Sequence, residues 1–328
     1  MTSRAAEGRA AIVAGNEGRT PPGAPSGGPG PGGIVLVAKP AGLTSFKALA
    51  PVKRRLGTRH LGHTGTLDSF ASGLLVVLAG AYTRLGPWFT AFDKLYVARL
   101  VFGEETDTLD PEGSVVATAP LPERAALEAV LPAFRGAILQ APPAYSALHI
   151  EGERASERAR RGETLVMKER PVTISLLELE DFEGREATLR VRCSSGTYIR
   201  SLARDLALAV GSRARLSGLE RLEVGPFALA GARPADELEP GRDLLPLDPE
   251  LATRMGFVPA FMDAATLSRF SKGAFIDPQA LRFGTEGPGR GQAPTSPLAM
   301  FSPSLEFRGV MNLEGGALRY RFVIGEGR

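Results

Sequence analysis

Short apolar runs recur along the first two-thirds of the chain and predict β-strands. Residues 34–38 and 74–78 are continuously apolar, as in strands that are buried on both faces, whereas residues 189–193 alternate apolar and polar side chains. Similar runs predict further strands at residues 96–102 and 173–179. These runs together predict a sizeable sheet.

A second pattern, with apolar residues every three or four positions, predicts helices at residues 123–134 and 198–210. The apolar positions are Leu127, Val130, Leu131 and Phe134 in the first helix, and Leu202, Leu206 and Val210 in the second. A third helix is expected from Thr44 or Ser45, either of which could cap it, to about Leu56. Helices and strands do not alternate regularly, which favours an α+β fold over a doubly wound parallel sheet.

Composition divides the chain into four segments. Residues 1–33 are rich in Gly, Pro, Ala and Ser and predict a disordered tail, because they cannot bury enough apolar surface to offset chain entropy. Residues 34–233 contain the predicted sheet and helices, residues 234–250 predict a linker rich in proline and acids, and residues 251–328 predict a small β-rich domain. The strands expected in this domain are residues 298–301, 307–311 and 317–324, and residues 284–297 are expected to form a flexible loop.

Overall charge and cysteine content restrict the class of protein only weakly. The 39 Lys and Arg nearly balance the 36 Asp and Glu, so the net charge of +3 indicates no particular partner. The one cysteine, Cys193, excludes an internal disulfide, fits a reducing compartment and lies in a strand pattern. No apolar run reaches the roughly 20 residues of a membrane-spanning helix, and the N-terminus lacks a secretory h-region. A soluble, cytoplasmic protein without membrane contact is therefore expected.

Residues 62–83 contain the most distinctive candidate for chemistry, Asp68. This carboxylate lies in a predicted turn between glycines, with His63 just before it and an apolar strand after it. Glycines such as Gly65 and Gly73 leave room for the backbone of another molecule, because they lack a Cβ atom. An isolated Asp in such a turn commonly just caps it, so the interpretation of Asp68 depends on the rest of the chain.

Two groups of basic residues are candidate phosphate contacts, although such groups are commonly only solvated surface. The first comprises Lys53, Arg54, Arg55 and Arg59, and the second Arg154, Arg158, Arg160 and Arg161. The spacing of Arg154, Arg158 and Arg161 predicts that they share one face of a helix.

Motifs for metal, nucleotide or hydrolase chemistry are missing from the sequence. The candidates for nitrogen or sulfur ligands are His60, His63, His149 and Cys193, and they show no zinc spacing. The sequence has no G-x-x-x-x-G-K-[ST] loop and no G-x-S-x-G elbow. No metal and no cofactor are therefore expected.

Between about residues 34 and 227, a series of short motifs occurs in a fixed order. The motifs are Lys39-Pro40…Gly42…Thr44-Ser45, Gly62-His63-Thr64-Gly65-Thr66-Leu67-Asp68, Asp93-Lys94-Leu95-Tyr96, Gly103…Thr106-Asp107-Thr108…Asp110…Gly113, Gln140-Ala141-Pro142-Pro143…Ser146-Ala147, Gly196-Thr197-Tyr198-Ile199-Arg200 and Leu219…Arg221…Gly225-Pro226-Phe227. In this order they resemble the motifs of the bacterial tRNA pseudouridine-55 synthases, the TruB family. The resemblance implies a pseudouridine synthase fold: an α+β domain with a mixed, mainly antiparallel sheet and a central cleft, then a small β-rich, PUA-like domain.

The resemblance also implies roles for individual residues. Asp68 corresponds to the catalytic aspartate of the family, Arg200 to its arginine partner and Tyr96 to the tyrosine that stacks on the target base. His63 is expected to fill the space that the extruded nucleotide leaves. The other residues expected to bind substrate or to line its pocket are Tyr198, Leu219, Lys39 and Asp110.

The chain departs from the family pattern at several positions. After the aspartate the family usually has P-L-A-T-G, whereas residues 69–73 read S-F-A-S-G, and a turn without proline is expected to be less rigid. Ser195 and His149 stand at usual lysine positions, and Ser156 at a usual tyrosine position. These departures are expected to affect RNA affinity more than catalysis.

The resemblance thus implies a stand-alone tRNA pseudouridine(55) synthase. Its partner would be the T-arm of tRNA, and it would act as a monomer without a cofactor or an obligatory protein partner. Two alternatives stay open. One is an RNA-binding protein or tRNA-folding chaperone with little turnover, and the other is an RNA-guided member of the same superfamily that needs a guide and protein partners.

Overall fold

The computed structural model describes residues 32–150, 152–284 and 296–325 of the chain. The predicted tail at residues 1–33 lies almost entirely outside the described residues, and so does most of the predicted loop at residues 284–297. None of the helices in the described ranges is long and apolar enough to cross a membrane.

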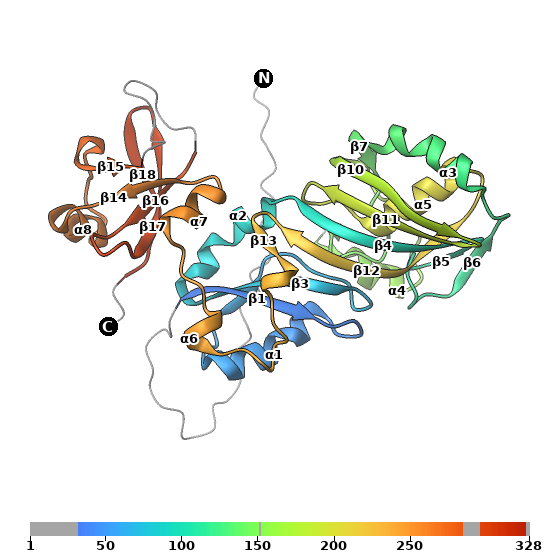
Figure 1. Cartoon of the computed structure of the whole chain (residues 1–328), viewed down its shortest axis with the longest axis horizontal. Helices are drawn as coiled ribbons and strands as arrows, with labels where there is room; N and C mark the ends of the chain where they lie inside the picture. Colours follow the sequence, from blue (N-terminus) through green and yellow to red (C-terminus); the bar gives the residue numbers. More distant parts are fainter. Residues whose placement is uncertain (1–31, 151, 285–295, 326–328) are drawn as a thin grey trace.

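A nine-stranded sheet forms the main body of the molecule (Figure 1). Its strands are β1 (Gly33–Lys39), β2 (Leu61–His63), β3 (Ser72–Ala79), β4 (Lys94–Phe102), β7 (Gly136–Gln140), β10 (Arg170–Glu183), β11 (Glu186–Cys193), β12 (Ala214–Val224) and β13 (Phe227–Ala228). Their order is β1-β3-β12-β4-β11-β10-β7, with β2 paired to β3 and β13 to β12. Only the β3–β12 pair is parallel. This confirms the predicted α+β fold with a mixed, mainly antiparallel sheet.

The strands predicted from apolar runs lie within β1, β3, β4, β10 and β11. Alternate residues of β1 and β3 contact two different apolar clusters, one containing Ile34 and Leu74 and the other containing Val35 and Leu75. Burial on both faces explains why these two strands are continuously apolar instead of alternating.

The predicted helices are also present in the structure. They are α1 (Ser45–Leu56), α3 (Arg124–Val130) and α5 (Ile199–Ala209). The α3 helix is shorter than predicted because the chain continues as a 3₁₀ helix, Leu131–Phe134, at Pro132. Proline lacks the N–H that an α-helix needs at that point.

Several short elements were not predicted from the sequence, because they are too short to show a periodic pattern. They are α2 (Gly86–Ala91), the hairpin of β5 (Glu104–Thr106) and β6 (Val115–Thr118), and the hairpin of β8 (His149–Ile150) and β9 (Glu153–Arg154). The helix α4 (Ala155–Arg160) was expected from the spacing of its arginines. The loop of the first hairpin and the helix α4 line the candidate site described below.

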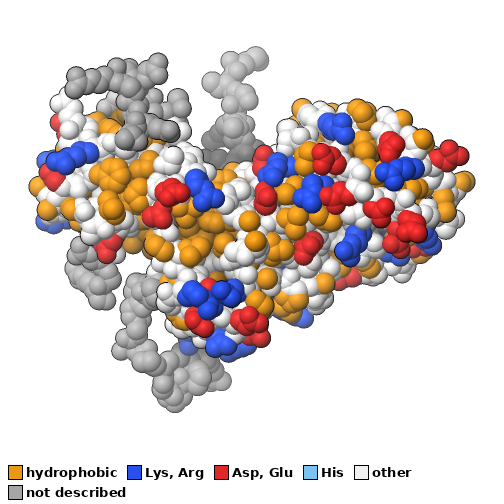
Figure 2. Space-filling view, in the orientation of Figure 1, with side chains coloured by type: hydrophobic (Ala, Val, Ile, Leu, Met, Phe, Trp, Pro, Cys, Tyr) orange, Lys and Arg blue, Asp and Glu red, His pale blue; other side chains and the backbone are white. Residues whose placement is uncertain are grey.

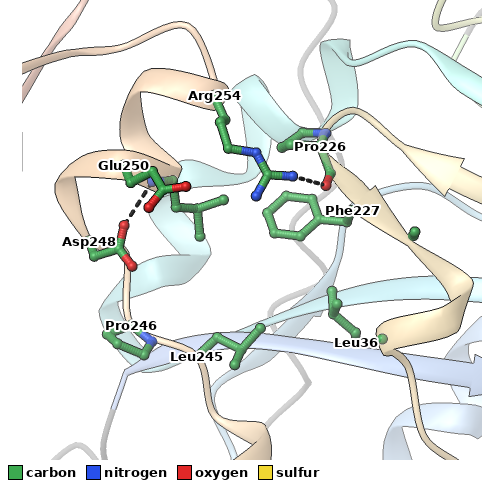
Figure 3. Close-up of a pocket in the computed structure, with 11 residues that line it drawn as sticks. Leu36, Pro226, Phe227, Leu245, Pro246, Asp248, Glu250 and Arg254 are labelled. Atoms are coloured by element: carbon green, nitrogen blue, oxygen red, sulfur yellow. Dashed lines mark hydrogen bonds between the residues drawn. The ribbon is translucent and has the colours of Figure 1, made fainter.

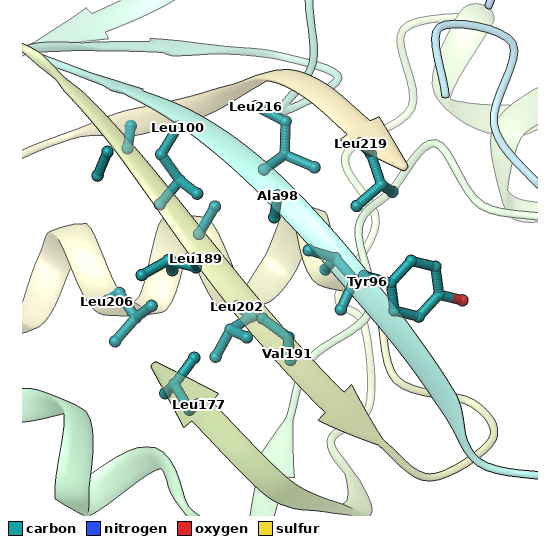
Figure 4. Close-up of a cluster of buried hydrophobic side chains, with 14 of the residues drawn as sticks. Tyr96, Ala98, Leu100, Leu177, Leu189, Val191, Leu202, Leu206, Leu216 and Leu219 are labelled. Atoms are coloured by element: carbon teal, nitrogen blue, oxygen red, sulfur yellow. The ribbon is translucent and has the colours of Figure 1, made fainter. Parts of the chain in front are cut away.

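The α5 helix lies against the sheet and forms the largest apolar cluster with it (Figure 4). Leu202 and Leu206 are fully buried against residues of the central strands, such as Leu100 and Leu189. Fully burying one such leucine stabilises the fold by roughly 1.5–3 kcal/mol. The cluster therefore fixes the position of α5 and of the side chains at its N-terminus.

The last part of the chain forms a second, five-stranded sheet, in the order β15-β14-β16-β17-β18. Its elements are α7 (Pro249–Arg254), β14 (Val258–Phe261), α8 (Ala264–Ser271), β15 (Arg282–Phe283), β16 (Leu298–Phe301), β17 (Phe307–Glu314) and β18 (Ala317–Val323). This sheet packs on the main body through aromatic pairs, with ring centroids 5.5 Å apart for Tyr82–Phe307 and 5.6 Å for Trp88–Phe257. A β-rich C-terminal part is thus confirmed, while its likeness to a PUA domain stays a prediction.

Residues 234–250, the predicted linker, contain α6 (Pro240–Asp243) and run beside β1. Ile34 and Leu245 exchange two backbone hydrogen bonds, of 2.9 and 2.8 Å, and Leu238 and Leu247 are buried. This segment is therefore joined to the main sheet by both hydrogen bonds and apolar contacts.

A largely apolar cavity of about 420 Å³ lies where α7 meets β1 and β13 (Figure 3). Its lining includes Leu36, Phe227 and Leu245, and the Nη2 of Arg254 donates a 2.9 Å hydrogen bond to the carbonyl of Pro226 at its edge. None of the site residues expected from the sequence lines this cavity.

Candidate active site

Asp68 begins a four-residue turn between β2 and β3. The N–H of Ala71 donates a 3.2 Å hydrogen bond to the carbonyl of Asp68 and closes the turn. Gly73, the second residue of β3, has a φ of +106°, and a Cβ atom there would lie 2.4 Å from the carbonyl oxygen of Arg221. Glycine therefore allows β3 to leave the turn in direct contact with β12.

The residues on both sides of Asp68 are held by the segment that follows β1. The Ser45 hydroxyl accepts from the N–H of Leu67 at 2.8 Å and donates to the carbonyl of Leu67 at 3.0 Å. The N–H of Gly42 donates to the carbonyl of Ser69 at 2.7 Å. Asp68 thus lies between two anchored residues, which restricts where its carboxylate points.

Lys39 binds the backbone of the segment after β1 and of the Asp68 turn through its side-chain nitrogen. Its side chain is buried, and its Nζ donates to the carbonyls of Pro40 at 2.9 Å, Leu43 at 2.5 Å and Ser69 at 3.5 Å. Burial lowers the pKa of Lys39 to about 8, and the Asp68 carboxylate partly opposes that shift. The sequence motif Lys39-Pro40…Gly42…Thr44-Ser45 therefore builds a support for the Asp68 turn.

We expect Ser45→Ala to lower the free energy of unfolding by about 1–3 kcal/mol, because it leaves the N–H and the carbonyl of Leu67 buried without a partner. Urea unfolding checks this. The matched control is Ser175→Ala, which removes an exposed hydroxyl that donates to the carbonyl of Arg192 and should change the unfolding free energy by less than about 0.5 kcal/mol. Equal effects of the two variants would contradict the anchoring role of Ser45.

Arg200, the second residue of α5, joins Asp68 to a second carboxylate, Asp110. Its Nη2 donates to Oδ1 of Asp68 at 3.1 Å, and its Nε lies 2.9 Å from Oδ2 of Asp68. Its Nη1 donates to Oδ2 of Asp110 at 3.2 Å. The guanidinium also donates to the carbonyls of Thr108 and Tyr145, at 2.8 and 2.9 Å. The planar fork of an arginine is suited to holding two carboxylates in a fixed geometry.

Asp110 belongs to a tightly hydrogen-bonded loop between β5 and β6. Oδ1 of Asp110 accepts from the Thr108 hydroxyl at 2.6 Å and from the N–H of Glu112 at 3.0 Å. Leu109 has a φ of +62°, a conformation that costs energy for a residue with a side chain. A Cβ atom at Gly113 would lie 2.3 Å from the Thr108 hydroxyl oxygen. Asp110 is therefore a carboxylate held by its own loop, and it binds the Arg200 guanidinium.

The electrostatic environment acts on Asp68 in both directions. Burial raises the pKa of the Asp68 carboxyl above its usual value, Asp110 and Glu112 add to this rise, and the Arg200 guanidinium counteracts it. About a third of the Asp68 side chain stays exposed, whereas that of Arg200 is 6% exposed. Asp68 thus combines a fixed orientation with access from solvent.

A polar cavity of about 410 Å³ opens over this ion pair. Its lining residues are Asp68, Ser69, Asp107, Thr108, Asp110, Glu112, Gly113, Ser114, Tyr145, Ser156, Arg160 and Arg200. In this cavity Asp68, Arg200 and Asp110 come together as expected from the sequence, and Ser156 of α4 borders it as well. Carboxylates outnumber guanidinium groups among the lining residues.

Tyr96 and Leu219 do not line this cavity; they belong to the apolar cluster that the sheet forms with α5. In Figure 4 the Tyr96 ring lies at one end of the cluster, with its hydroxyl directed away from the leucines. Burial raises the pKa of Tyr96, which Arg221 opposes and the Asp68 carboxylate increases. Tyr96 is therefore a protonated phenol at neutral pH, within electrostatic reach of Asp68.

His63 and Tyr198, which belong to two other elements, do not line the cavity either. His63 ends β2, burial and Arg221 lower its pKa, and its buried Nδ1 has no hydrogen-bond partner in the described part of the chain. The N–H of Tyr198, at the start of α5, donates to Oε1 of Gln140 at 2.8 Å. Burial raises the pKa of Tyr198, and Asp68 contributes to the rise.

Two buried cations that the sequence did not single out hold the backbone around the site. Arg221 of β12 donates from Nε to the carbonyl of Leu74 at 2.8 Å and from Nη2 to that of Gly65 at 3.1 Å. Lys94 of β4 donates to the carbonyls at the end of α2, and burial lowers its pKa to about 8. The one sequence signal that could have indicated these two residues is a charged side chain at a buried position of a strand. The strand predicted for Cys193 is confirmed, and burial raises its pKa to about 11.

The prediction that Arg154, Arg158 and Arg161 share a helical face is wrong. Arg154 belongs to β9, and Arg161 follows α4, so only Arg158 of the three lies within the helix. Arg158 pairs with Glu163 at 2.6 Å, and Arg161 pairs with Glu153 at 2.5 Å. The hairpin that precedes the helix draws these arginines into local ion pairs.

No group of three or more His, Cys, Asp or Glu side chains within the described ranges is arranged to hold a metal ion. The carboxylates of Asp68 and Asp110 are both paired with Arg200.

Known proteins resemble this chain in sequence. The model of a family described as TruB family pseudouridylate synthase (N terminal domain) matches residues 53–199. A tRNA pseudouridine synthase B of Borreliella burgdorferi (strain ZS7) is 40% identical over 248 residues, which cover 75% of this chain and 86% of the relative. A protein of the same name from Treponema pallidum (strain Nichols) is 48% identical over 226 residues, and the chain spans only 62% of its length.

Solved structures resemble this chain in fold. A structure described as a Cbf5-Nop10-Gar1 complex superposes with a TM-score of 0.65 and 23% identity, over 89% of this chain and 84% of that one. An H/ACA RNP bound to a substrate RNA containing 2′-deoxyuridine gives a TM-score of 0.66 and 21% identity, over 90% and 85%. At these identities the likeness is one of fold.

Proposed function

Since the chain belongs to the TruB family of pseudouridylate synthases, we propose that it converts the uridine at position 55 in the T-loop of tRNA to pseudouridine. The observation that carries this proposal is the Asp68 carboxylate, which contacts the Arg200 guanidinium through both of its oxygens and lines a cavity. The motifs that led to the expected roles of these residues converge on this one place.

The reaction exchanges one glycosidic bond for another. The bond between N1 of uracil and C1′ of the ribose breaks, the ring turns, and C5 joins C1′, while the C5 proton leaves to solvent and N1 gains a proton. Asp68 attacks the uracil ring or C1′, or assists at C2′, and each route needs an ionised carboxylate beside the glycosidic bond. Arg200 keeps Asp68 ionised and fixed, so the group needs little reorganisation when the nucleotide arrives.

The charges around the cavity suit a neutral base better than a phosphate. Asp107 and Glu112 line it in addition to the two carboxylates that Arg200 neutralises. Tyr96 would stack on the base, an interaction that gives about 1–3 kcal/mol, with Leu219 as a neighbouring wall. Neutral His63, with its free Nδ1, would fill the space that the extruded nucleotide leaves.

Phosphate contacts would come from local clusters of cations. The face of the molecule in Figure 2 shows basic and acidic side chains interspersed, without one broad basic surface. None of Lys53, Arg54, Arg55 and Arg59, near the end of α1, forms an ion pair within the described residues, so the four remain available to RNA. We assign catalysis to residues 34–233 and RNA binding to residues 251–328, with residues 234–250 between them.

A tritium-release assay tests the proposal. The purified protein is incubated with an unmodified T-arm transcript that carries tritium at uracil C5. Release without any added guide or protein supports a stand-alone enzyme. Binding without release would instead indicate an RNA chaperone, and release only with a guide and partner proteins an RNA-guided enzyme.

The pH profile gives a second prediction. Because Asp68 must be ionised and its pKa is raised, kcat/KM should fall as the pH decreases, with a midpoint above the ordinary 3.8 of an aspartate. Single-turnover tritium release between acidic and neutral pH measures this, with circular dichroism at each pH to show that the fold persists. A midpoint at or below 3.8 would contradict the environment assigned to Asp68.

A further inference from the structure

Ser69 occupies the position of the Asp68 turn where a proline is most favourable. The hydrogen bond from Ala71 N–H to the Asp68 carbonyl makes Ser69 the second residue of a four-residue turn. Proline suits that position because its ring presets φ near the value that the turn needs. This chain has a serine there, so another contact must restrict the turn if Asp68 is to keep its orientation.

The structure contains such a contact. The Ser69 hydroxyl donates a short hydrogen bond to Oε1 of Glu112, a residue of the loop between β5 and β6. The backbone of Glu112 is itself fixed, because its N–H donates to Oδ1 of Asp110 at 3.0 Å and the following Gly113 lies too close to Thr108 for a side chain. The backbone of Glu112 is therefore held in place, and its side chain reaches Ser69 from that fixed point.

The contact completes a ring around Asp68. From Asp68 the chain leads to Ser69, whose hydroxyl binds Glu112. Glu112 binds Asp110 through its N–H, Asp110 binds Arg200, and Arg200 binds Asp68. Loss of any one link frees one side of the turn, while the other links remain.

We propose that the Ser69–Glu112 hydrogen bond takes the place of a proline in this chain and, together with the backbone anchors of residues 67 and 69, positions Asp68 for catalysis. The proposal rests on the function proposed above. Ser69 and Glu112 are positioning residues, since they act on the reaction through Asp68.

The effect of the Ser69 hydroxyl on the turn can be separated from the effect of the Glu112 charge on the pKa of Asp68. The charged or titratable groups that face Asp68 are Arg200 from α5, Asp110 and Glu112 from the β5–β6 loop, Lys39 from the end of β1, Tyr96 from β4 and Tyr198 before α5. Within this set Glu112 raises the pKa of Asp68. A neutral glutamine at position 112 still accepts from Ser69 but no longer contributes that charge.

Four variants test the proposal in two measurements: the pH profile of single-turnover tritium release, and the hydrogen exchange of the Ala71 amide. Ser69→Ala should lower the plateau rate roughly ten- to hundredfold, as expected for losing a hydrogen bond to a charged group, and should speed Ala71 exchange about tenfold or more. Ser69→Pro should restore both to within about threefold of the original chain. Glu112→Gln keeps a neutral acceptor for the Ser69 hydroxyl, so it should lower the plateau rate less than Ser69→Ala does, and it should move the acid midpoint to lower pH. Ser175→Ala, far from the site, is the control and should change neither measurement.

Two results would overturn the proposal. One is a Ser69→Ala variant whose rate and Ala71 exchange match those of the original chain. The other is a Ser69→Pro variant as impaired in both as Ser69→Ala, which would show that the hydroxyl acts by something other than fixing the turn. If the original chain itself releases no tritium, the proposed function fails, and the exchange of the Ala71 amide still decides whether the contact fixes the turn.

Discussion

Asp68→Asn should abolish product formation while the protein stays folded. Asparagine has the same shape and can still accept from Nη2 of Arg200 through its side-chain oxygen, but it carries no charge and is no nucleophile. Removing a nucleophile of this kind lowers kcat by about 10⁴- to 10⁶-fold. Single-turnover tritium release from the T-arm transcript measures the loss.

The binding of RNA separates a catalytic from a structural role for Asp68. The dissociation constant for the T-arm should change by no more than about threefold in Asp68→Asn, since phosphate contacts supply most of the affinity. Asp236→Asn, an exposed aspartate in the segment before α6, is the matched control and should keep full turnover. Unchanged turnover in Asp68→Asn would refute the role of this residue.

Arg200→Met should have the second largest effect, on both stability and rate. It leaves the carboxylates of Asp68 and Asp110 without their shared cation, and two backbone carbonyls without their donor. Breaking a buried ion pair by removing one partner costs about 3–5 kcal/mol. With the guanidinium gone, the main group that opposes the burial-driven rise in the pKa of Asp68 is lost, so the acid midpoint of the remaining activity should move further upward.

Urea unfolding and the pH profile check these expectations for Arg200. Arg200→Lys keeps the charge but not the fork, so its loss of stability should lie between those of the original chain and Arg200→Met. The control is Arg124→Met, which breaks an ion pair with Glu128 in which both side chains are 50% exposed and should cost less than about 1 kcal/mol. An Arg200→Met protein that unfolds at the original urea concentration would contradict the central place of this ion pair.

The fold could be predicted largely from the sequence, because its main elements bury regular apolar patterns. The strands β1 and β3 are continuously apolar since both of their faces are covered, and α5 shows its apolar stripe at Leu202 and Leu206. The β5–β6 and β8–β9 hairpins were not predicted, since elements of two to four residues show no period. The arginines around α4 do not share one helical face, because Arg158 and Arg161 form ion pairs with Glu163 and Glu153.

The prediction of the candidate site depended on the order of the motifs along the chain, because the residues of the site are far apart in sequence. Asp68 and Arg200 are separated by 132 residues, and no local pattern indicates that they meet. The residues that hold the backbone around the site were still harder to predict from the sequence. Lys39 was expected to bind substrate, and Arg221 stood in a motif without an assigned role; only the structure shows both of them buried and donating to backbone carbonyls. The Ser69–Glu112 contact arises where the chain departs from the usual motif, so resemblance could not have revealed it.

The position of the modified base tests the central claim most directly. A full-length unmodified tRNA transcript is incubated with the protein alone, labelled with a carbodiimide that marks pseudouridine, and copied by reverse transcriptase. We expect one new stop, at the uridine of position 55, with the original chain and none with Asp68→Asn. A stop at another uridine, or the same stop with Asp68→Asn, would contradict the assignment.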